Sequence, residues 1–184
     1  MFCTSVASVL AAASSVGVGG SRTPFPAAMA CGWSLVTSLL VARPAVLVSC
    51  GSGVPSLVRA ACADAVVFSA SDPAYRGLGW AAYAARAAAM IRALAVAPSP
   101  LWICFPAGAC PVAAAGGVGR SWFSCGSGSW SECRMAAGLG VSVLVFLPSG
   151  VVPPGQWGAW SFVGASAGGR WFLLAACAPA PTLF

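Results

Sequence analysis

Charged side chains are too sparse in this 184-residue chain to cover the surface of an ordinary compact domain. The sequence has nine basic residues, all of them Arg, and three acidic residues, so that 7% of the chain is charged. A typical soluble domain carries about 25% charged residues. Apolar residues make up 59% of the chain, and the mean hydropathy is +0.89. The composition leaves three interpretations: a membrane protein, a chain that aggregates, or a polypeptide never selected to fold.

The missing residue types follow the genetic code more closely than they follow chemistry. Lys, Asn and His are absent, Gln156 is the single Gln, and there are two Tyr and three acidic residues. All of these residues have codons with adenine in the middle position. Selection for a membrane would disfavour Lys and Asp, but it gives no reason to remove Asn and His while nine Arg remain. The hypothesis is therefore a reading frame that stays open because its coding strand is poor in adenine, and that was not selected for function.

The best-defined element that the sequence predicts is an isolated α-helix over about residues 73–97. Asp72 can cap the first free amide groups, Pro73 suits the first helical position, and Pro98 ends the run. Apolar side chains recur on one face at helical spacing, and these are Trp80, Tyr83, Ala87, Met90, Ile91 and Leu94. A stripe of this kind indicates packing against other residues more often than a cofactor site.

Residues 135–152, "MAAGLGVSVLVFLPSGVV", are predicted to form a transmembrane helix. The segment has about the minimum length for a span, and its glycines, serines and Pro148 make insertion marginal. Residues 23–42 and 158–178 are weaker candidates for spans, and the second of these carries Arg170 near its middle.

The same segment also fits a β-strand, because valines alternate along "VSVLVF", residues 141–146, and valine favours pleated surfaces. Apart from these two elements, we expect a mainly irregular chain with no globular fold. Residues 1–184 are interpreted as one low-complexity hydrophobic chain without a clear domain boundary. Residues 124–130, "SCGSGSW", resemble a flexible linker.

Two short motifs resemble catalytic or phosphate-binding loops but lack the residues that such loops need. "GASAGG", residues 164–169, contains Gly-x-Ser-x-Gly around Ser166, yet the chain has no His and no Lys to take the proton of a serine nucleophile. "AAAGGVGRS", residues 113–121, resembles a P-loop in which Arg120 replaces the Lys and Ala114 replaces the first Gly. We therefore predict no catalytic residue and no cofactor-binding residue.

Cysteine spacing and Arg distribution argue against metal and nucleic-acid binding. The nine Cys are an odd number without a Cys-x-x-Cys pair, and the absence of His removes mixed Cys/His zinc sites. The nine Arg are scattered, so the net charge of +6 comes from missing acids and provides no basic run for a phosphate backbone. The prediction is no metal site and no nucleic-acid partner.

No specific biochemical activity follows from these observations. The predicted function is that of an uncharacterised hydrophobic polypeptide that is not an enzyme and has no cofactor. The alternative is a small integral membrane protein with one to three spans and a structural or interaction role, which would contact the lipid bilayer through residues 135–152. The sequence does not define a location, and a stably expressed chain is expected in a membrane.

Overall fold

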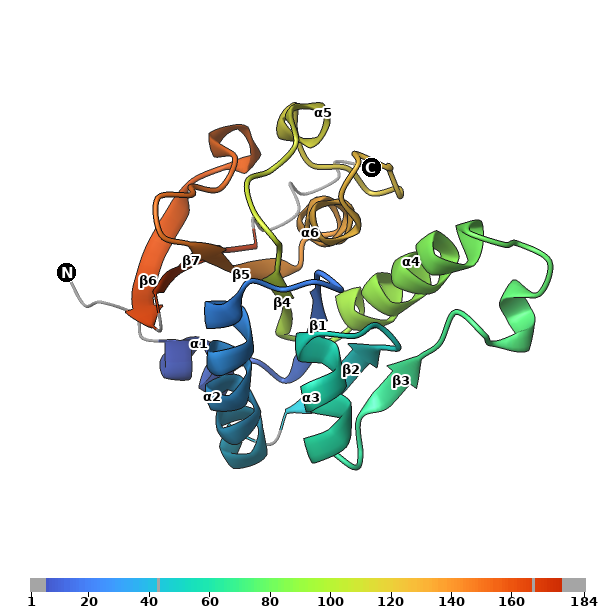
Figure 1. The fold of residues 1–184 in the computed structure, drawn as a ribbon, viewed down its shortest axis with the longest axis horizontal. Helices are drawn as coiled ribbons and strands as arrows, with labels where there is room; N and C mark the ends of the chain where they lie inside the picture. Colours follow the sequence, from blue (N-terminus) through green and yellow to red (C-terminus); the bar gives the residue numbers. More distant parts are fainter. Residues whose placement is uncertain (1–5, 43, 167, 177–184) are drawn as a thin grey trace, which may run out of the picture.

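The chain forms a mixed β-sheet with helices packed on both of its faces (Figure 1). The computed structural model describes residues 6–42, 44–166 and 168–176. Seven strands lie in the order β3-β2-β1-β4-β5-β7-β6. Their bounds are Ser15–Gly20 (β1), Ala45–Ser49 (β2), Val66–Phe68 (β3), Pro100–Phe105 (β4), Ser142–Pro148 (β5), Trp160–Ser166 (β6) and Gly169–Leu174 (β7). Strands β1 to β5 are parallel, and the β6–β7 hairpin adds to β5 in antiparallel pairing through β7.

Helices connect the parallel strands and divide between the two faces of the sheet. The helices are α1 (Val6–Ala12), α2 (Pro26–Ala42), α3 (Val54–Ala61), α4 (Ala81–Ala95), α5 (Val112–Ala115) and α6 (Gly128–Gly138), with short 3-10 turns η1 (Pro73–Tyr75) and η2 (Gly155–Trp157). The first three α-helices pack on one face, and α4, α5 and α6 pack on the other. This alternation of strand and helix is what a parallel sheet requires, because each strand must start again from the same end.

The high hydropathy of the chain comes largely from central strands that are buried on both faces. Residues 101–105 of β4 and 143–147 of β5 are all buried. A strand covered on both sides needs apolar side chains at every position, so it appears in the sequence as a continuous apolar run. Strand β1 meets the same requirement with glycines: a Cβ at Gly17 would lie 2.6 Å from the ring of Trp102, which fills the space above it.

The transmembrane helix predicted over residues 135–152 is wrong. Helix α6 ends at Gly138, Gly140 turns the chain with a φ of 78°, and β5 follows in the middle of the sheet. The β-strand interpretation of this segment agrees with β5. None of the helices in the described ranges has both the length and the apolar run needed to cross a bilayer.

The two weaker candidates for spans are also wrong. Residues 23–42 contain α2, whose Cys31, Leu35 and Leu39 are buried against the sheet. Residues 158–178 contain the β6–β7 hairpin, and the last two of them lie outside the described residues. Both segments are apolar because one of their faces is packed against protein.

The helix predicted over residues 73–97 is shorter than expected and is not isolated. Asp72 accepts a hydrogen bond from the Ala74 amide at 2.8 Å, as predicted, but this cap begins only the short turn η1. Gly77 and Gly79 then adopt positive φ angles of 85° and 53°, which a right-handed helix does not allow. Helix α4 therefore starts at Ala81, and it packs on β1, β2 and β4.

This fold overturns both functional interpretations drawn from composition. A mainly irregular, unselected chain would not be expected to form a seven-stranded sheet with a buried core on each face. A small membrane protein with one to three helical spans is not compatible with the arrangement of the candidate segments. The codon-like bias in residue types is real, but the apolar residues that remain are placed as an α/β sheet requires.

Candidate ligand-binding cavity

The order of the strands creates a crevice at the carboxyl ends of β1 and β4. From β1 the chain moves to β2 and β3 on one side, and it then returns to β4 on the other side. Loops that leave neighbouring strands in opposite directions leave an opening between them, and ligands of open α/β sheets bind at such a point. A cavity of about 850 Å³ occupies this place, and we call it the switch-point cavity. Its lining comes from the ends of β1 and β2, the loops that follow β1, β2 and β4, helix α4 and the first turn of α6.

Strand β1 ends at the cavity with glycine at its last two positions. A Cβ at Gly19 would lie 2.5 Å from Oε2 of Glu132, and a Cβ at Gly20 would lie 3.1 Å from the carbonyl oxygen of Phe105. Gly19 therefore leaves room for the Glu132 carboxyl group, and Gly20 leaves room for the neighbouring strand β4 at Phe105. After them, the Ser21 hydroxyl oxygen accepts a hydrogen bond from the amide of Thr23 at 3.1 Å.

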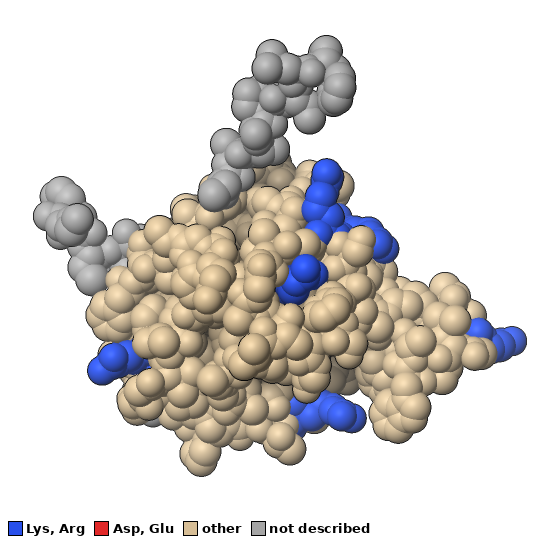
Figure 2. Space-filling model, turned by 90° about the horizontal axis from the view of Figure 1, so that it is seen from above, with Lys and Arg blue, Asp and Glu red and all other residues tan. Residues whose placement is uncertain are grey.

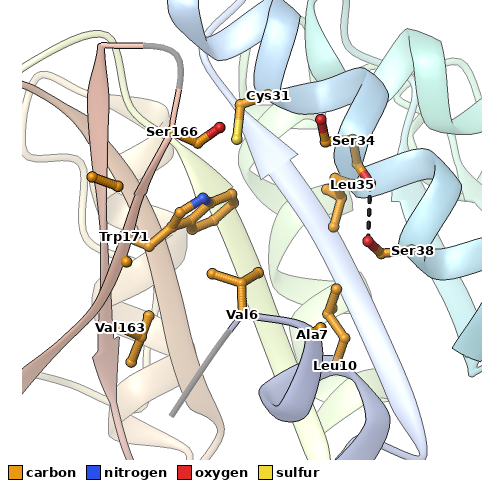
Figure 3. Close-up of a pocket in the computed structure, with 12 residues that line it drawn as sticks. Val6, Ala7, Leu10, Cys31, Ser34, Leu35, Ser38, Val163, Ser166 and Trp171 are labelled. Atoms are coloured by element: carbon orange, nitrogen blue, oxygen red, sulfur yellow. Dashed lines mark hydrogen bonds between the residues drawn. The ribbon is translucent and has the colours of Figure 1, made fainter. Parts of the chain in front are cut away.

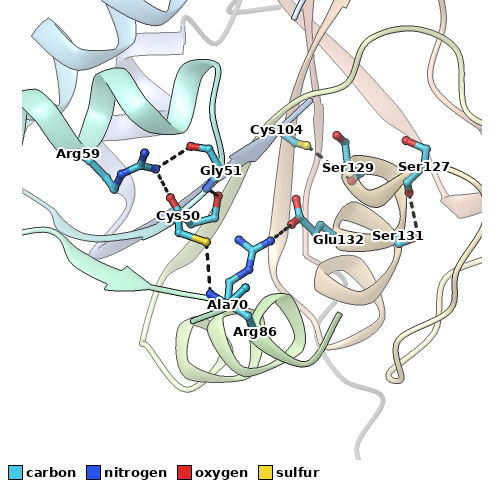
Figure 4. Close-up of polar contacts among 11 residues, drawn as sticks. Cys50, Gly51, Arg59, Ala70, Arg86, Cys104, Ser127, Ser129, Ser131 and Glu132 are labelled. Atoms are coloured by element: carbon cyan, nitrogen blue, oxygen red, sulfur yellow. Dashed lines mark hydrogen bonds and ion pairs between the residues drawn. The ribbon is translucent and has the colours of Figure 1, made fainter. Parts of the chain in front are cut away.

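The loop after β2 is fastened to its surroundings by Arg59 of α3. One guanidinium nitrogen of Arg59 donates to the carbonyl oxygen of Ser49 and, at 2.8 Å, to that of Gly51 (Figure 4). The Ser52 hydroxyl donates to the carbonyl oxygen of Arg22 at 3.2 Å, which joins this loop to the loop after β1. Arg59 therefore positions the loop after β2, and it does not itself line the cavity.

A buried pair of opposite charges faces the cavity from two helices. Arg86 of α4 places Nη2 3.7 Å from Oε1 of Glu132 of α6, and the side chains are 8% and 7% exposed (Figure 4). Within the part of the chain that the structure describes, Nε and Nη1 of Arg86 have no hydrogen-bond partner. A buried donor without an acceptor costs about 1–3 kcal/mol, and more when it is charged. The Arg86–Glu132 pair therefore leaves two hydrogen-bond donors of Arg86 without an acceptor.

The Glu132 carboxyl group differs from an ordinary surface acid. Burial raises the pKa of Glu132 to about 7, and the nearby charge of Arg86 opposes that rise. A pKa in this range means that the carboxyl group exchanges its proton near neutral pH. The site therefore holds a group that can be either neutral or negative under ordinary conditions.

The first turn of α6 presents backbone amides to the same cavity. Ser127 precedes the helix, and its hydroxyl oxygen accepts from the amide of Trp130 at 3.5 Å. The Trp130 indole nitrogen donates to the carbonyl oxygen of Gly108 at 3.0 Å, which fixes the loop after β4. Gly128 and Ser129 line the cavity at the amino end of the helix, where the helix dipole favours negative charge.

Exposed aromatic rings border the cavity on the α4 side. Trp80 and Tyr83 stack with ring centroids 5.9 Å apart, and they are 80% and 45% exposed. Both belong to the cavity lining, as does Trp122. Exposed rings beside a polar cavity provide a surface on which a planar group can stack.

The sequence motif around Ser166 lies elsewhere. Ser166 ends β6 and lines a second cavity of about 350 Å³ between α2 and the β6–β7 hairpin, together with Cys31 and Trp171 (Figure 3). A nucleophile elbow is a turn from strand to helix, whereas Ser166 lies in a hairpin between two strands. Burial raises the pKa of the Cys31 thiol to about 11, so this cavity has no ready nucleophile in that thiol.

The P-loop-like segment, residues 113–121, does not line the switch-point cavity. It forms most of α5 and a loop in which a Cβ at Gly119 would lie 2.6 Å from the Arg134 guanidinium group. The segment predicted as a linker, residues 124–130, includes the N-cap and first turn of α6 and contributes several residues to the cavity.

The residues that form the cavity were missed in the sequence because no short motif joins them. Arg86 and Glu132 are far apart along the chain; Arg86 lies among alanines, and Glu132 lies between Ser131 and Cys133. The available indication was "GVGGSR", residues 17–22, which is a glycine-rich strand end and the start of the turn that leads to an apolar helix.

Neither a metal centre nor a basic patch stands out among the residues described. His, Cys, Asp and Glu residues in the described ranges form no group of three that could hold a metal ion. On the face shown in Figure 2, Arg side chains adjoin one another only at the upper right and are otherwise scattered. No known protein family, curated protein or solved structure matches the chain.

Proposed function

We propose that this protein binds a small phosphorylated molecule with a planar ring, the chemistry of a mononucleotide, in the switch-point cavity. The observation that carries the proposal is the Arg86 guanidinium group, which faces the cavity, is more than nine-tenths buried and has two nitrogens without a partner among the described residues. Guanidinium groups match the oxygens of phosphate in charge and geometry. A phosphate group that reaches these nitrogens through a small rotation of the Arg86 side chain toward the cavity would satisfy donors that the protein leaves unpaired.

Two further features support the phosphate end of this ligand. The first-turn amides of α6 near Gly128 and Ser129 add partial positive charge on one wall. Gly20, the last residue of β1, lines the cavity at the end of the strand, where nucleotide-binding α/β sheets place a glycine-rich turn.

The ring end of the ligand is inferred from the stacked pair Trp80 and Tyr83 at the rim. A planar base stacked on such a ring gains about 1–3 kcal/mol in single-stranded nucleic-acid complexes. The cavity volume of about 850 Å³ lies within the range of small-molecule sites. A mononucleotide combines the two groups that this cavity is suited to hold.

We further propose that the protein binds this ligand without chemical turnover. The chain has no His and no Lys, and Glu132 is the one carboxyl group among the described residues that line the cavity. A second candidate function is acid–base catalysis on the bound ligand, which is favoured by the pKa of about 7 at Glu132. Release of base or phosphate from AMP during prolonged incubation would favour this second candidate.

The test is calorimetric titration of the protein with AMP, adenosine and inorganic phosphate. AMP is expected to bind at least tenfold more tightly than either fragment. Arg86→Met should weaken AMP binding by about 10- to 100-fold, because a hydrogen bond to a charged group contributes about 1.5–3 kcal/mol. The same substitution should leave the weak binding of adenosine unchanged.

Arg92→Met is the matched control. Arg92 lies on the same helix but is exposed and does not line the cavity. Circular dichroism establishes that both variants fold. Equal loss of AMP binding in the two variants, or equal binding of AMP and adenosine to the wild type, would contradict the proposal.

A further inference from the structure

We propose that anion binding in the switch-point cavity is proton-linked: the ligand anion occupies Arg86 as Glu132 takes up one proton from solvent. The inference rests on the proposed function and concerns the regulation of the same site. It starts from the geometry of the Arg86–Glu132 pair, in which the guanidinium and carboxyl groups face each other inside the cavity (Figure 4). An anion that binds the guanidinium group therefore arrives beside the carboxyl group.

The Glu132 carboxylate and a bound anion compete for the guanidinium group of Arg86. With Glu132 ionised, the carboxylate at 3.7 Å offsets the Arg86 charge, and a second anion would lie close to it in a buried site. Like charges at short range in a site removed from water repel each other strongly. Protonation of Glu132 removes that repulsion and leaves the full guanidinium charge for the ligand.

Glu132 is the group of this cluster that can make the exchange near neutral pH. Arg22, Tyr83 and Arg86 line the same cavity, and Gly19 of β1 has no side chain to titrate. Cys104 of β4 lies behind Glu132, and burial raises the pKa of this thiol well above its ordinary value, so the thiol remains neutral. Cys133 follows Glu132 on α6 and is also buried.

The balance of the step is simple. One proton moves from solvent to a carboxylate oxygen of Glu132, no covalent bond other than this O–H bond forms, and the ligand anion accepts hydrogen bonds from Nε or Nη1 of Arg86. Burial raises the pKa of Glu132 to about 7 in the unliganded protein. An anion at Arg86 raises this pKa further, because it adds negative charge beside the carboxyl group. Linkage then makes the affinity fall about tenfold per pH unit above pH 7 and level off below it.

The probe is adenosine 5′-sulfate, which resembles AMP but keeps one negative charge between pH 5.5 and 8.5. Its affinity for the wild-type protein is measured by calorimetry across this range. At pH 8.0 the titration is repeated in two buffers of different ionisation enthalpy, which reports the number of protons taken up. The expected results are a dissociation constant about tenfold higher at pH 8.5 than at pH 7.5, and uptake of close to one proton per ligand.

Glu132→Gln is the direct variant, because glutamine imitates the protonated carboxyl group. It should bind the probe with the affinity of the wild type at acidic pH, without pH dependence and without proton uptake. Asp72→Asn is the control, since Asp72 is exposed and caps η1 outside the cavity, and it should behave as the wild type. If circular dichroism shows that Glu132→Gln does not fold, the proton count on the wild type still tests the linkage, because the absence of uptake at pH 8.0 would overturn it.

The experiments distinguish failure of the proton linkage, failure of the proposed function and failure of the role assigned to Glu132. Binding of the probe with no proton uptake and no change in affinity between pH 7.5 and 8.5 would overturn the proton linkage and leave the proposed function in place. Failure of both AMP and the probe to bind at any pH would overturn the proposed function and this inference with it. A pH dependence that persists in Glu132→Gln would assign the proton to another group and overturn the role of Glu132.

Discussion

At the scale of single residues, the three acidic side chains occupy very different environments. Asp64 and Asp72 are exposed, whereas Glu132 is buried and lies beside Arg86. Burial of an ion pair is costly because both groups lose their hydration, and here the geometry leaves Arg86 nitrogens unpaired. The Arg86–Glu132 pair lowers stability where it is buried, at the carboxyl ends of the parallel strands. Such a cost is expected at a site that binds a ligand.

The raised pKa of Glu132 predicts how the stability of the fold depends on pH. The folded state holds this proton up to about pH 7, whereas a carboxyl group in the unfolded chain releases it near pH 4.5. Between these values the folded state binds more protons, so the contribution of Glu132 to stability is greatest below pH 4.5 and is lost as the pH rises to 7. The full loss is on the order of 3 kcal/mol.

Urea unfolding of the wild type and Glu132→Gln at several pH values between 4.5 and 8 tests this expectation. The variant should gain stability relative to the wild type as the pH rises to 7, and the difference should then become constant. Asp72→Asn provides the control for a general effect of removing an acid. A difference between Glu132→Gln and the wild type that is independent of pH would contradict the assigned burial.

At the scale of elements, the segment over residues 135–152 illustrates what an apolar run does and does not determine. The alternation of valines agrees with a strand, and β5 occupies Ser142–Pro148. The length of the apolar segment alone suggested a membrane span, because a strand buried on both faces and a short span have similar composition. The turn at Gly140 was the local feature that separates the two cases.

Burial of β5 predicts a large difference between two substitutions in the same segment. Leu144 is fully buried in the core on the α2 face, and Val152 is 68% exposed beyond the end of the strand. Leu144→Ala should lower the free energy of unfolding by about 2–5 kcal/mol, whereas Val152→Ala should change it by less than about 0.5 kcal/mol. Urea unfolding measures both, and equal effects would contradict the placement of β5 in the sheet.

Helix α4 shows how much of an element could be predicted locally. Asp72 accepts the predicted hydrogen bond, but it caps η1 and not α4, whereas Met90, Ile91 and Leu94 are buried as their spacing indicated. Trp80 belongs to the same predicted stripe but is exposed, because the helix begins only after the positive φ angles at Gly77 and Gly79. Local spacing predicts a buried face well, but it does not reveal where glycines interrupt a helix.

At the scale of the whole molecule, the site depends on contacts that short motifs do not record. The cavity exists because β1 and β4 are neighbours, a pairing between residues that are far apart in the sequence. Arg86 and Glu132 meet only after α4 and α6 pack on the same face of that sheet. Composition did not distinguish between fold classes, because a content of 59% apolar residues fits both a sheet covered on two faces and a membrane protein.

Hydrogen–deuterium exchange with and without AMP tests the central claim, that a phosphorylated ligand binds at the carboxyl ends of the parallel strands. The account predicts slower exchange at residues 19–23 and 126–132, which lie in and beside the cavity wall, and loss of this protection in Arg86→Met. Protection confined to residues 31–38 and 163–166, around the second cavity, would contradict the account. So would the absence of any change at saturating AMP.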